Sequence, residues 1–318
     1  MTARHIACAI ACAVALPASG EPRGESVVID GVPHVKQRPD FCGEACVAMY
    51  AHKLGVAIDQ DDVFAATGLD PALGRGAYTQ DLVRAVKALG FAPPHVYTLV
   101  DARAPAAGIA RELDALRKDL ARGVPSILCM HYDAQPHTTE HFRLVVGYDA
   151  ERDEIVYNEP AEDDGGYRRM TRARLAQLWP LPSSDASKRV LVRIPLVAAH
   201  VAAPARAADG ASPADLVQHV MALNERLADW GRGGMGIRVT APFVVIGVQN
   251  NAAALRWARD HLPRDHGAVV DVFVFRDRLG YEHGVQRLTG EPPPARDGFV
   301  AGDVMYVNVS ALDSRRAN

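Results

Sequence analysis

One stretch, VPHVKQRPDFCGEACVAM at residues 32–49, constrains the fold of this chain more than any other. A short strand-like run leads into a turn, and Cys42 then begins a helix that we expect to be amphipathic and to extend to about residue 54. A helix N-terminus carries about half a positive charge, so a thiol placed there ionises more easily, and the thiolate is the nucleophile. Upstream, the side-chain amide of Gln37 can donate to a developing oxyanion. The stretch therefore predicts a cysteine hydrolase assembled around Cys42.

The length of 318 residues predicts two folded units, and a net charge of -3 argues against nucleic acid or an anionic membrane as partner. A basic start, an apolar run at residues 6–16 and small residues after it are typical of a secretory signal peptide. We place this signal peptide at residues 1–20. The apolar run is shorter than the roughly 20 residues that a membrane span needs. We therefore expect a secreted or periplasmic protein without a membrane span, with lipidation at Cys12 as the alternative.

Removal of the signal peptide takes away Cys8 and Cys12 and leaves Cys42, Cys46 and Cys129. An odd number of cysteines in an exported protein means at least one free or reactive thiol. We expect Cys46 to lie in the core. The sequence does not decide whether Cys46 and Cys129 form a disulfide.

Hydrophobic periodicity predicts helices in the first part of the chain and strands after them. The expected helices span residues 40–54, 59–67, 79–90 (capped by Thr79) and 109–121. Strands are expected at residues 125–130, 141–148, 154–159, 167–170 and 190–197, with a further helix at 171–178. Helices first and an antiparallel sheet after them indicate the α+β class.

Residues 198–212 are rich in Ala, Pro and Gly and lack periodicity, which predicts a linker between domains. A helix starting at Ser212 and Pro213 follows, with Ser as its cap. The remaining pattern predicts strands at 243–248, 269–275 and 304–309 and helices at 252–261 and 277–286. We therefore predict a first domain at residues 27–197 and a small α/β domain at residues 213–318.

A cysteine nucleophile needs a base, and the base needs an orienting partner. In chain order, His141 begins the first strand of a predicted hairpin, and Glu159 ends the second. A turn that is symmetric about Glu151 places Leu144 opposite Asn158, so that His141 and Glu159 share one sheet face as diagonal neighbours. A shift of one residue in the register reverses this assignment. The sequence therefore favours Glu159 as the orienting group and keeps Asn158 as the alternative.

Three elements in this order, QRPDFCGEACVAM, EHFRLVVGYD and VYNEPA, resemble the double-glycine leader peptidase-like family, a branch of the papain-like cysteine peptidases. The resemblance covers about residues 32–181. It implies a papain-like fold, a peptide or protein substrate and no cofactor. It also implies that Cys42 is the nucleophile and His141 the base. Glu159 would then orient the base, and Gln37 would help to form the oxyanion hole.

The sequence departs from the family pattern at two places. The family usually has Asp where this chain has Glu159, and it usually has Asp before the nucleophile, where this chain has Phe41. The spacing from Gln37 to Cys42 is also one residue shorter than expected. These differences concern the oxyanion hole more than the nucleophile. We expect Arg143, two residues after the base, to be solvated or structural.

Metal chemistry is not predicted in either domain. His131, His137 and His141 lack the spacing of a metal site, because Pro136 and the strand after it break any helical periodicity. In the second domain, the segments APFVVIG, VVDVFVFRDRLGYE and VMYVNVS resemble the leading half of secreted zincin-type metallopeptidase domains. The His-Glu-x-x-His motif that would follow is absent from the sequence, so the resemblance implies a zincin-like region that is either truncated or has lost its metal site, without zinc.

The function predicted from these residues is an exported cysteine-type peptidase that cleaves peptide or related amide bonds. Two alternatives use the same fold. One is a non-catalytic module that binds a peptide or a cell-wall fragment. The other is an acyltransferase that uses the same residues.

Overall fold

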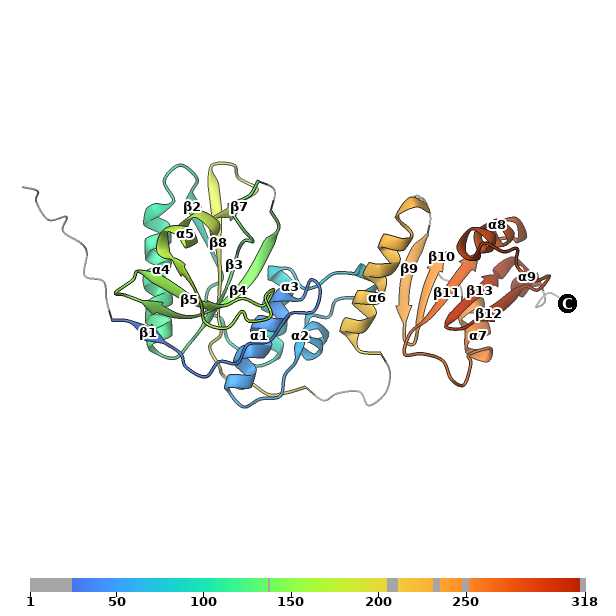
Figure 1. The fold of residues 1–318 in the computed structure, drawn as a ribbon, viewed down its shortest axis with the longest axis horizontal. Coiled ribbons are helices and arrows are strands. Elements are labelled where there is room, and N and C mark those ends of the chain that lie inside the picture. The colour runs from blue at the N-terminus through green and yellow to red at the C-terminus, as the bar shows by residue number, and fades with distance from the viewer. Residues whose placement is uncertain (1–24, 137, 205–210, 231–234, 248–251, 315–318) are drawn as a thin grey trace, which may run out of the picture.

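The computed structural model describes residues 25–136, 138–204, 211–230, 235–247 and 252–314 of the chain. Within these residues the strands form an eight-stranded and a five-stranded sheet (Figure 1). The predicted α+β class is confirmed. No helix in the described ranges combines the length and the apolar character that crossing a membrane requires. The expected signal peptide at residues 1–20 lies outside the described residues.

The first sheet has the strand order β2-β8-β3-β4-β5-β6, with β1 paired to β4 and β7 paired to β8, and its neighbouring strands are antiparallel. The strands are β1 (Val27–Val28), β2 (Tyr97–Asp101), β3 (Ser126–His131), β4 (Glu140–Asp149), β5 (Glu154–Asn158), β6 (Arg168–Thr171), β7 (Leu181–Pro182) and β8 (Lys188–Pro195). Strand β2 was not predicted, because it is an edge strand in which only Val100 is buried. A sequence of that kind carries no hydrophobic run.

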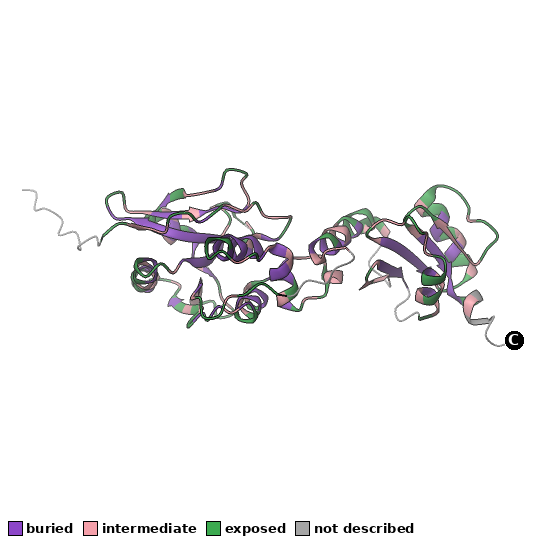
Figure 2. Cartoon of the chain, turned by 90° about the horizontal axis from the view of Figure 1, so that it is seen from below, coloured by how far each residue is buried: buried purple, intermediate pink, exposed green. Residues whose placement is uncertain are grey.

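Helices cover both faces of this sheet, and Figure 2 shows the strands between them as largely buried. On one face lie α1 (Cys42–Lys53), α2 (Gln60–Thr67) and α3 (Thr79–Ala88). On the other face lie α4 (Ala106–Ala121) and α5 (Arg172–Leu178). The prediction of an amphipathic α1 is wrong, since every residue from Gly43 to Ala51 is buried. A helix enclosed by the sheet and two other helices has no solvent-facing stripe.

Strand β4 and strand β5 form the predicted hairpin, with one irregularity that matters. Leu144 pairs with Asn158 as predicted. At the turn, however, Asp149 pairs with Glu154, so the hairpin is not symmetric about Glu151. The register shifts between Val145 and Gly147, where β4 carries one extra residue. Because of this β-bulge at Val146, Leu144 pairs with Asn158 at one end of the hairpin while Asp149 pairs with Glu154 at the turn.

The predicted cap of α3 is also wrong. Thr79 is the first residue of the helix, and the preceding residue, Tyr78, occupies the N-cap position. The backbone N–H of Tyr78 donates to Asp81 Oδ2 at 3.2 Å, so the carboxylate satisfies this end of the helix.

The second sheet has the order β12-β13-β11-β10-β9, in which β10, β11 and β13 are parallel and the edge strands β9 and β12 are antiparallel. Its elements are β9 (Gly236–Thr240), β10 (Phe243–Gly247), α7 (Ala252–Asp260), β11 (Val270–Phe275), α8 (Arg278–Thr289), β12 (Gly298–Ala301), β13 (Val304–Asn308) and α9 (Val309–Ser314). The two edge strands and α9 were not predicted. The start of the predicted linker is bound to the first region, because the N–H groups of Ala199 and His200 donate to the carbonyl of Gly90.

Helix α6 (Pro213–Arg226) follows the predicted linker. It contacts both the region that contains the first sheet and the region that contains the second sheet. Its Leu216 and Val220 pack in the core of the second sheet. Its Ala214 and Val217 are fully buried against Phe41 and Phe64 of the first region. Phe41 immediately precedes the predicted nucleophile, so α6 lies against the segment that leads into α1.

Polar contacts join the same surfaces. The side chain of Asp61 in α2 accepts from the backbone N–H of Ala214 at 2.8 Å. Arg38 lies between two carboxylates, 2.7 Å from Asp215 and 3.3 Å from Asp61. These ion pairs are partly exposed and contribute little by themselves, whereas the buried apolar contacts carry most of the stabilisation. The segment before Cys42 is therefore held in place by residues of α6.

The contact of α6 with Phe41 is tested by Val217→Asp. A carboxylate buried against the two phenylalanines has no partner there, so we expect the free energy of unfolding to fall by about 2–4 kcal/mol. Hydrogen exchange at residues 37–42 should also become faster. The matched control is Ala222→Asp, because Ala222 is exposed on the same helix. Equal behaviour of the two variants would show that α6 does not support this segment.

Candidate active site

A tight turn places Cys42 at the start of α1. The N–H of Phe41 donates to the carbonyl of Arg38 at 3.0 Å, with Pro39 at the second position of the turn. Asp40 occupies the third position with a φ of 63°, a conformation that L-residues other than Asn and Asp rarely adopt. The helix begins at Cys42, as predicted.

Gly43 allows α1 to approach its neighbours closely. A Cβ atom at this position would lie 2.8 Å from Leu82 Cδ2 and 3.1 Å from Phe142 Cδ2. A larger residue would displace Leu82 or Phe142, so glycine favours the close contact of the first turn of α1 with α3 and β4. This contact sets Cys42 against Phe142, the residue that follows His141.

The thiol of Cys42 does not ionise as easily as predicted. Its pKa is raised to about 12, chiefly by burial and also by the charges of Glu44 and Asp40. The backbone N–H of Phe142 and that of Gly43 act in the opposite direction, because they donate to the sulfur. Desolvation of the charged form thus exceeds the effect of the helix N-terminus. The prediction of an easily ionised thiol is wrong, and any reaction at Cys42 requires that a base remove the proton.

The structure brings His141 and Glu159 together. His141 Nε2 lies 2.5 Å from Glu159 Oε1, and both side chains are buried. The other carboxylate oxygen, Oε2, accepts from Arg143 Nε at 2.6 Å. Because Glu159 engages Nε2 of the imidazole, Nδ1 is the nitrogen that can accept a thiol proton. Burial raises the pKa of Glu159, but the hydrogen bond from His141 and the charges of His141 and Arg143 outweigh burial, and the pKa is lowered.

The side chain of Asn158 has a different partner. Its Oδ1 accepts from the backbone N–H of Tyr167 at 2.8 Å, and its buried Nδ2 has no hydrogen-bond partner among the described residues. Between the two alternatives, the residue that contacts His141 is Glu159.

The backbone of Gln37 is hydrogen-bonded to the residue that follows Glu159. Its backbone N–H donates to the carbonyl of Pro160 at 2.8 Å, and its side-chain Oε1 is buried without a partner among the described residues. The amide of Gln60 in α2 fixes the backbone on both sides of Gln37. It donates to the carbonyl of Lys36 at 3.0 Å and accepts from the N–H of Arg38 at 2.9 Å. Gln60 was not predicted, since nothing in its local pattern distinguishes it from a polar residue of a surface helix.

Cys42 and His141 are not joined directly. Within the described part of the chain, no hydrogen bond links the thiol of Cys42 to the imidazole. Catalytic hydrogen bonds are often long before substrate binds. The Glu159–Arg143 pair does lie near the first turns of α1, because both charges act on the thiol of Cys46, one turn after Cys42. Cys46 is fully buried, as predicted.

A cleft of about 850 Å³ opens beside Cys42. One wall is a face of the first sheet, on which Tyr97, Val192, Cys129 and Phe142 form a row of paired residues across four strands. The opposite wall is the segment 75–81, which includes the start of α3. A substrate bound in this cleft would lie next to the thiol.

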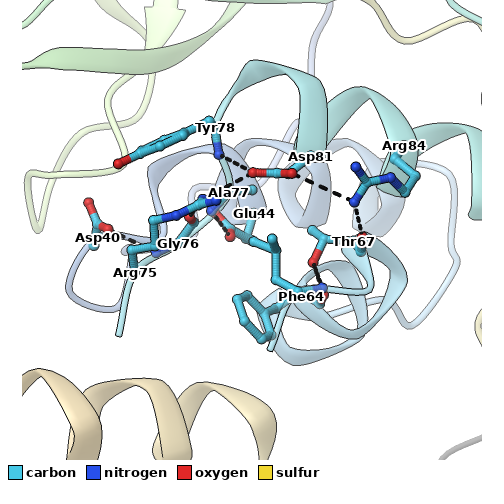
Figure 3. A network of polar contacts seen from close by, with 11 residues as sticks. Asp40, Glu44, Phe64, Thr67, Arg75, Gly76, Ala77, Tyr78, Asp81 and Arg84 are labelled. Atoms are coloured by element: carbon cyan, nitrogen blue, oxygen red, sulfur yellow. Dashed lines mark hydrogen bonds and ion pairs between the residues drawn. The ribbon is translucent and has the colours of Figure 1, made fainter. Parts of the chain in front are cut away.

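Two carboxylates hold the segment 75–81 against α1 (Figure 3). Asp40 Oδ2 accepts from the N–H of Gly76, and Glu44 Oε1 accepts from the N–H of Ala77, both at 2.8 Å. A Cβ atom on Gly76 would lie 1.9 Å from the carbonyl oxygen of Asp40, so only glycine permits this approach. The turn that presents Cys42 and the wall of the cleft are therefore parts of one hydrogen-bonded unit.

Glu44 is fully buried, and its Oε2 has no hydrogen-bond partner among the described residues. Burial raises its pKa from 4.5 to about 8, although the hydrogen bonds from the backbone of Glu44 and Ala77 lower it. The side chain is therefore mostly protonated at neutral pH. Glu44 then adds no buried negative charge beside Cys42.

In the described part of the chain, Cys42, Cys46 and Cys129 are free thiols. The same residues contain no group of three or more His, Cys, Asp or Glu side chains arranged to hold a metal ion. His137, one of the three histidines considered above, lies outside the described residues.

The pH dependence of stability should reveal the buried Glu44. The native state binds the proton of Glu44 more tightly than the unfolded state, so stability falls as the pH rises from 4.5 to about 8. The slope approaches about 1.4 kcal/mol per pH unit for a single group. Urea unfolding at a series of pH values should show this slope for the wild type. In Glu44→Gln, which keeps the acceptor for Ala77, it should be absent. Parallel curves for the two proteins would contradict this assignment.

Comparison with known proteins gives a family. A search of curated proteins finds no match to the chain. Among solved structures, the chain is similar to the peptidase domain of Streptococcus ComA, a bifunctional ABC transporter involved in quorum sensing. The identity is 17% and the TM-score 0.33, and the match covers 51% of this chain and 96% of that chain.

The chain is also similar to a double-glycine-motif protease from an AMS/PCAT transporter, solved in complex with the leader peptide. Here the identity is 15% and the TM-score 0.32, over 54% of this chain and 99% of that chain. Among protein families, residues 29–186 match the model of the Peptidase_C39 like family. This match confirms the resemblance carried by the three sequence elements, and it assigns residues 29–186 to the Peptidase_C39 like family.

Proposed function

We propose that this protein is a cysteine hydrolase that cleaves peptide or related amide bonds at Cys42. The observation that carries the proposal is the contact of His141 with Glu159, near a helix start that presents a cysteine to a cleft. A base held by a carboxylate next to a thiol is the arrangement that nucleophilic catalysis needs. Membership of residues 29–186 in a peptidase-like family supports it.

The proposed reaction starts from the thiol. Because the pKa of Cys42 is raised to about 12, His141 Nδ1 takes the proton as the sulfur bonds to the carbonyl carbon. The carbonyl oxygen becomes an oxyanion, to which Gln37 and the backbone N–H of Cys42 donate. Collapse of this intermediate breaks the C–N bond, and the amine leaves with the proton from His141. Water then attacks the thioester carbon while His141 takes its proton. The C–S bond breaks, the acid leaves, and His141 returns the proton to the sulfur of Cys42.

Glu159 keeps Nε2 of His141 protonated throughout this sequence and stabilises the imidazolium that forms when the thiol proton is taken. No step requires a cofactor. We also propose that the protein is exported, on the pattern of residues 1–20 alone.

The test of the proposed nucleophile is an epoxysuccinyl thiol probe, with the labelled residue located by mass spectrometry. We expect labelling at Cys42 between pH 6 and 8. His141→Ala should slow it by about 100-fold or more, as expected for loss of general-base catalysis. Cys46→Ser is the matched control, because it removes a thiol on the same helix, and that thiol does not line the cleft. Labelling of Cys42 should be unchanged in this variant.

Two results would overturn the proposal. One is the absence of labelling in the folded wild type. The other is labelling of Cys46 or Cys129 at the rate of Cys42. The raised pKa of Cys42 favours a second candidate, a non-catalytic module that binds a peptide or a cell-wall fragment in the same cleft. An unreactive Cys42 in a protein that still binds such ligands would support that candidate.

The orienting role of Glu159 is tested against that of Asn158. Glu159→Gln keeps the shape of the side chain but removes the charge that stabilises the imidazolium. It should slow labelling of Cys42 by about 10- to 100-fold, a part of what general-base catalysis contributes. Asn158→Ala should leave the rate within about twofold and lower only the thermal stability, since Asn158 bonds to the backbone of Tyr167. Loss of reactivity in Asn158→Ala alone would reverse the assignment.

A further inference from the structure

We propose that Arg143 is a positioning residue that holds Glu159 in place for His141. This inference rests on the proposed function, since it concerns the same reaction. Arg143 lies two residues after His141 on β4 and was expected to be solvated or structural. Of these two alternatives the solvated one is wrong, because the guanidinium is buried and binds the carboxylate that contacts His141.

The contacts of Arg143 fix the guanidinium as well as the carboxylate. Its Nε donates to Glu159 Oε2 at 2.6 Å, and its Nη2 donates to the carbonyl of Tyr132 at 2.8 Å. A weaker bond at 3.3 Å joins Nη1 to the carbonyl of His131. The guanidinium also lies 5.6 Å from the centre of the Tyr132 ring and 5.8 Å from that of Tyr157. Arg143 therefore has little freedom to move, so the oxygen that it binds has a defined position.

The other oxygen of Glu159 is also held. Oε1 accepts from the backbone N–H of Ala161 at 3.0 Å, in addition to its contact with His141. A glutamate has one more rotatable bond than the aspartate that the family usually carries here, and that bond has more freedom to lose. With both oxygens bound, the longer side chain presents Oε1 to His141 in one orientation. Arg143 thus compensates for the extra methylene group.

The charges also balance. Glu159 is a buried carboxylate, and a buried charge is costly unless it is paired and hydrogen-bonded. The bond from Arg143 allows the carboxylate to remain ionised while His141 is neutral, which is the state that precedes proton transfer from Cys42. Without Arg143, the neutral imidazole would be the only side-chain partner of this anion among the described residues.

The experiment uses the full chain with ¹⁵N-labelled histidine. The signals of His141 are assigned by their loss in His141→Ala, and they report which ring nitrogen carries the proton. In the wild type we expect one neutral tautomer, protonated at Nε2. Arg143→Met should give a mixture of the two tautomers. It should also lower the maximal rate of Cys42 labelling by about tenfold, with the probe's binding constant unchanged. Arg143→Lys, which can still donate to Glu159, should recover part of both.

Two comparisons separate positioning from a merely structural role. In the Glu159→Gln background, Arg143→Met should change the labelling rate by less than about twofold, because the two residues act as a unit. Arg193→Met is the matched control. Arg193 is likewise buried in the first sheet and pairs with carboxylates, Glu112 and Asp119, that do not contact the site. That variant should leave the tautomer unchanged.

A wild-type tautomer and labelling rate in Arg143→Met would overturn the inference, as would an equal loss of rate in the Glu159→Gln background. If Arg143→Met does not fold, Arg143→Lys decides: a partial mixture of tautomers and a partly lowered labelling rate support the inference, and a wild-type spectrum and rate overturn it. If Cys42 is unreactive in the wild type but the tautomer shifts as expected, the proposed hydrolase fails while the positioning of Glu159 by Arg143 stands.

Discussion

The β-bulge at Val146 is the constraint on which the arrangement of the site depends. Counted from the turn, where Asp149 pairs with Glu154, an unbroken ladder would set Leu144 opposite Glu159 and turn the carboxylate away from His141. The extra residue moves the register by one, so that Leu144 faces Asn158 instead. One inserted residue in β4 thus decides which of two neighbouring side chains contacts His141.

Burial dominates the electrostatics around Cys42. The thiol sits at a helix N-terminus, yet its pKa is raised because the first turn of α1 is covered and two acidic side chains lie nearby. Glu44 responds to the same burial by holding its proton up to about pH 8. Glu159 does not, since His141 and Arg143 offset its desolvation. The charge states of the Cys42 thiol, Glu44 and Glu159 therefore depend on which groups each side chain contacts.

The segment around Gln37 and Cys42 is positioned by elements that lie far away in the sequence. Gln60 of α2 holds the backbone beside Gln37, and α6 covers Phe41 from beyond the predicted linker. Phe41 replaces the aspartate usual in the family, and its ring fills a buried contact with Phe64 and α6. This departure from the family pattern is therefore explained by packing. The division into two domains stays a prediction, although α6 packs both in the core of the second sheet and against Phe41 and Phe64.

By itself, the sequence determined the class of the fold, the start of α1 at Cys42, the hairpin that carries His141 and Glu159, and the family of residues 29–186. Periodicity and turn residues act over a few positions, so they are readable without a structure. The tertiary structure decided the bulge, the burial that raises the pKa of Cys42, and the contacts of Arg143, Gln60 and α6. These depend on which distant segments cover a given side chain, and hydrogen-bond partners and desolvation arise only when those segments meet.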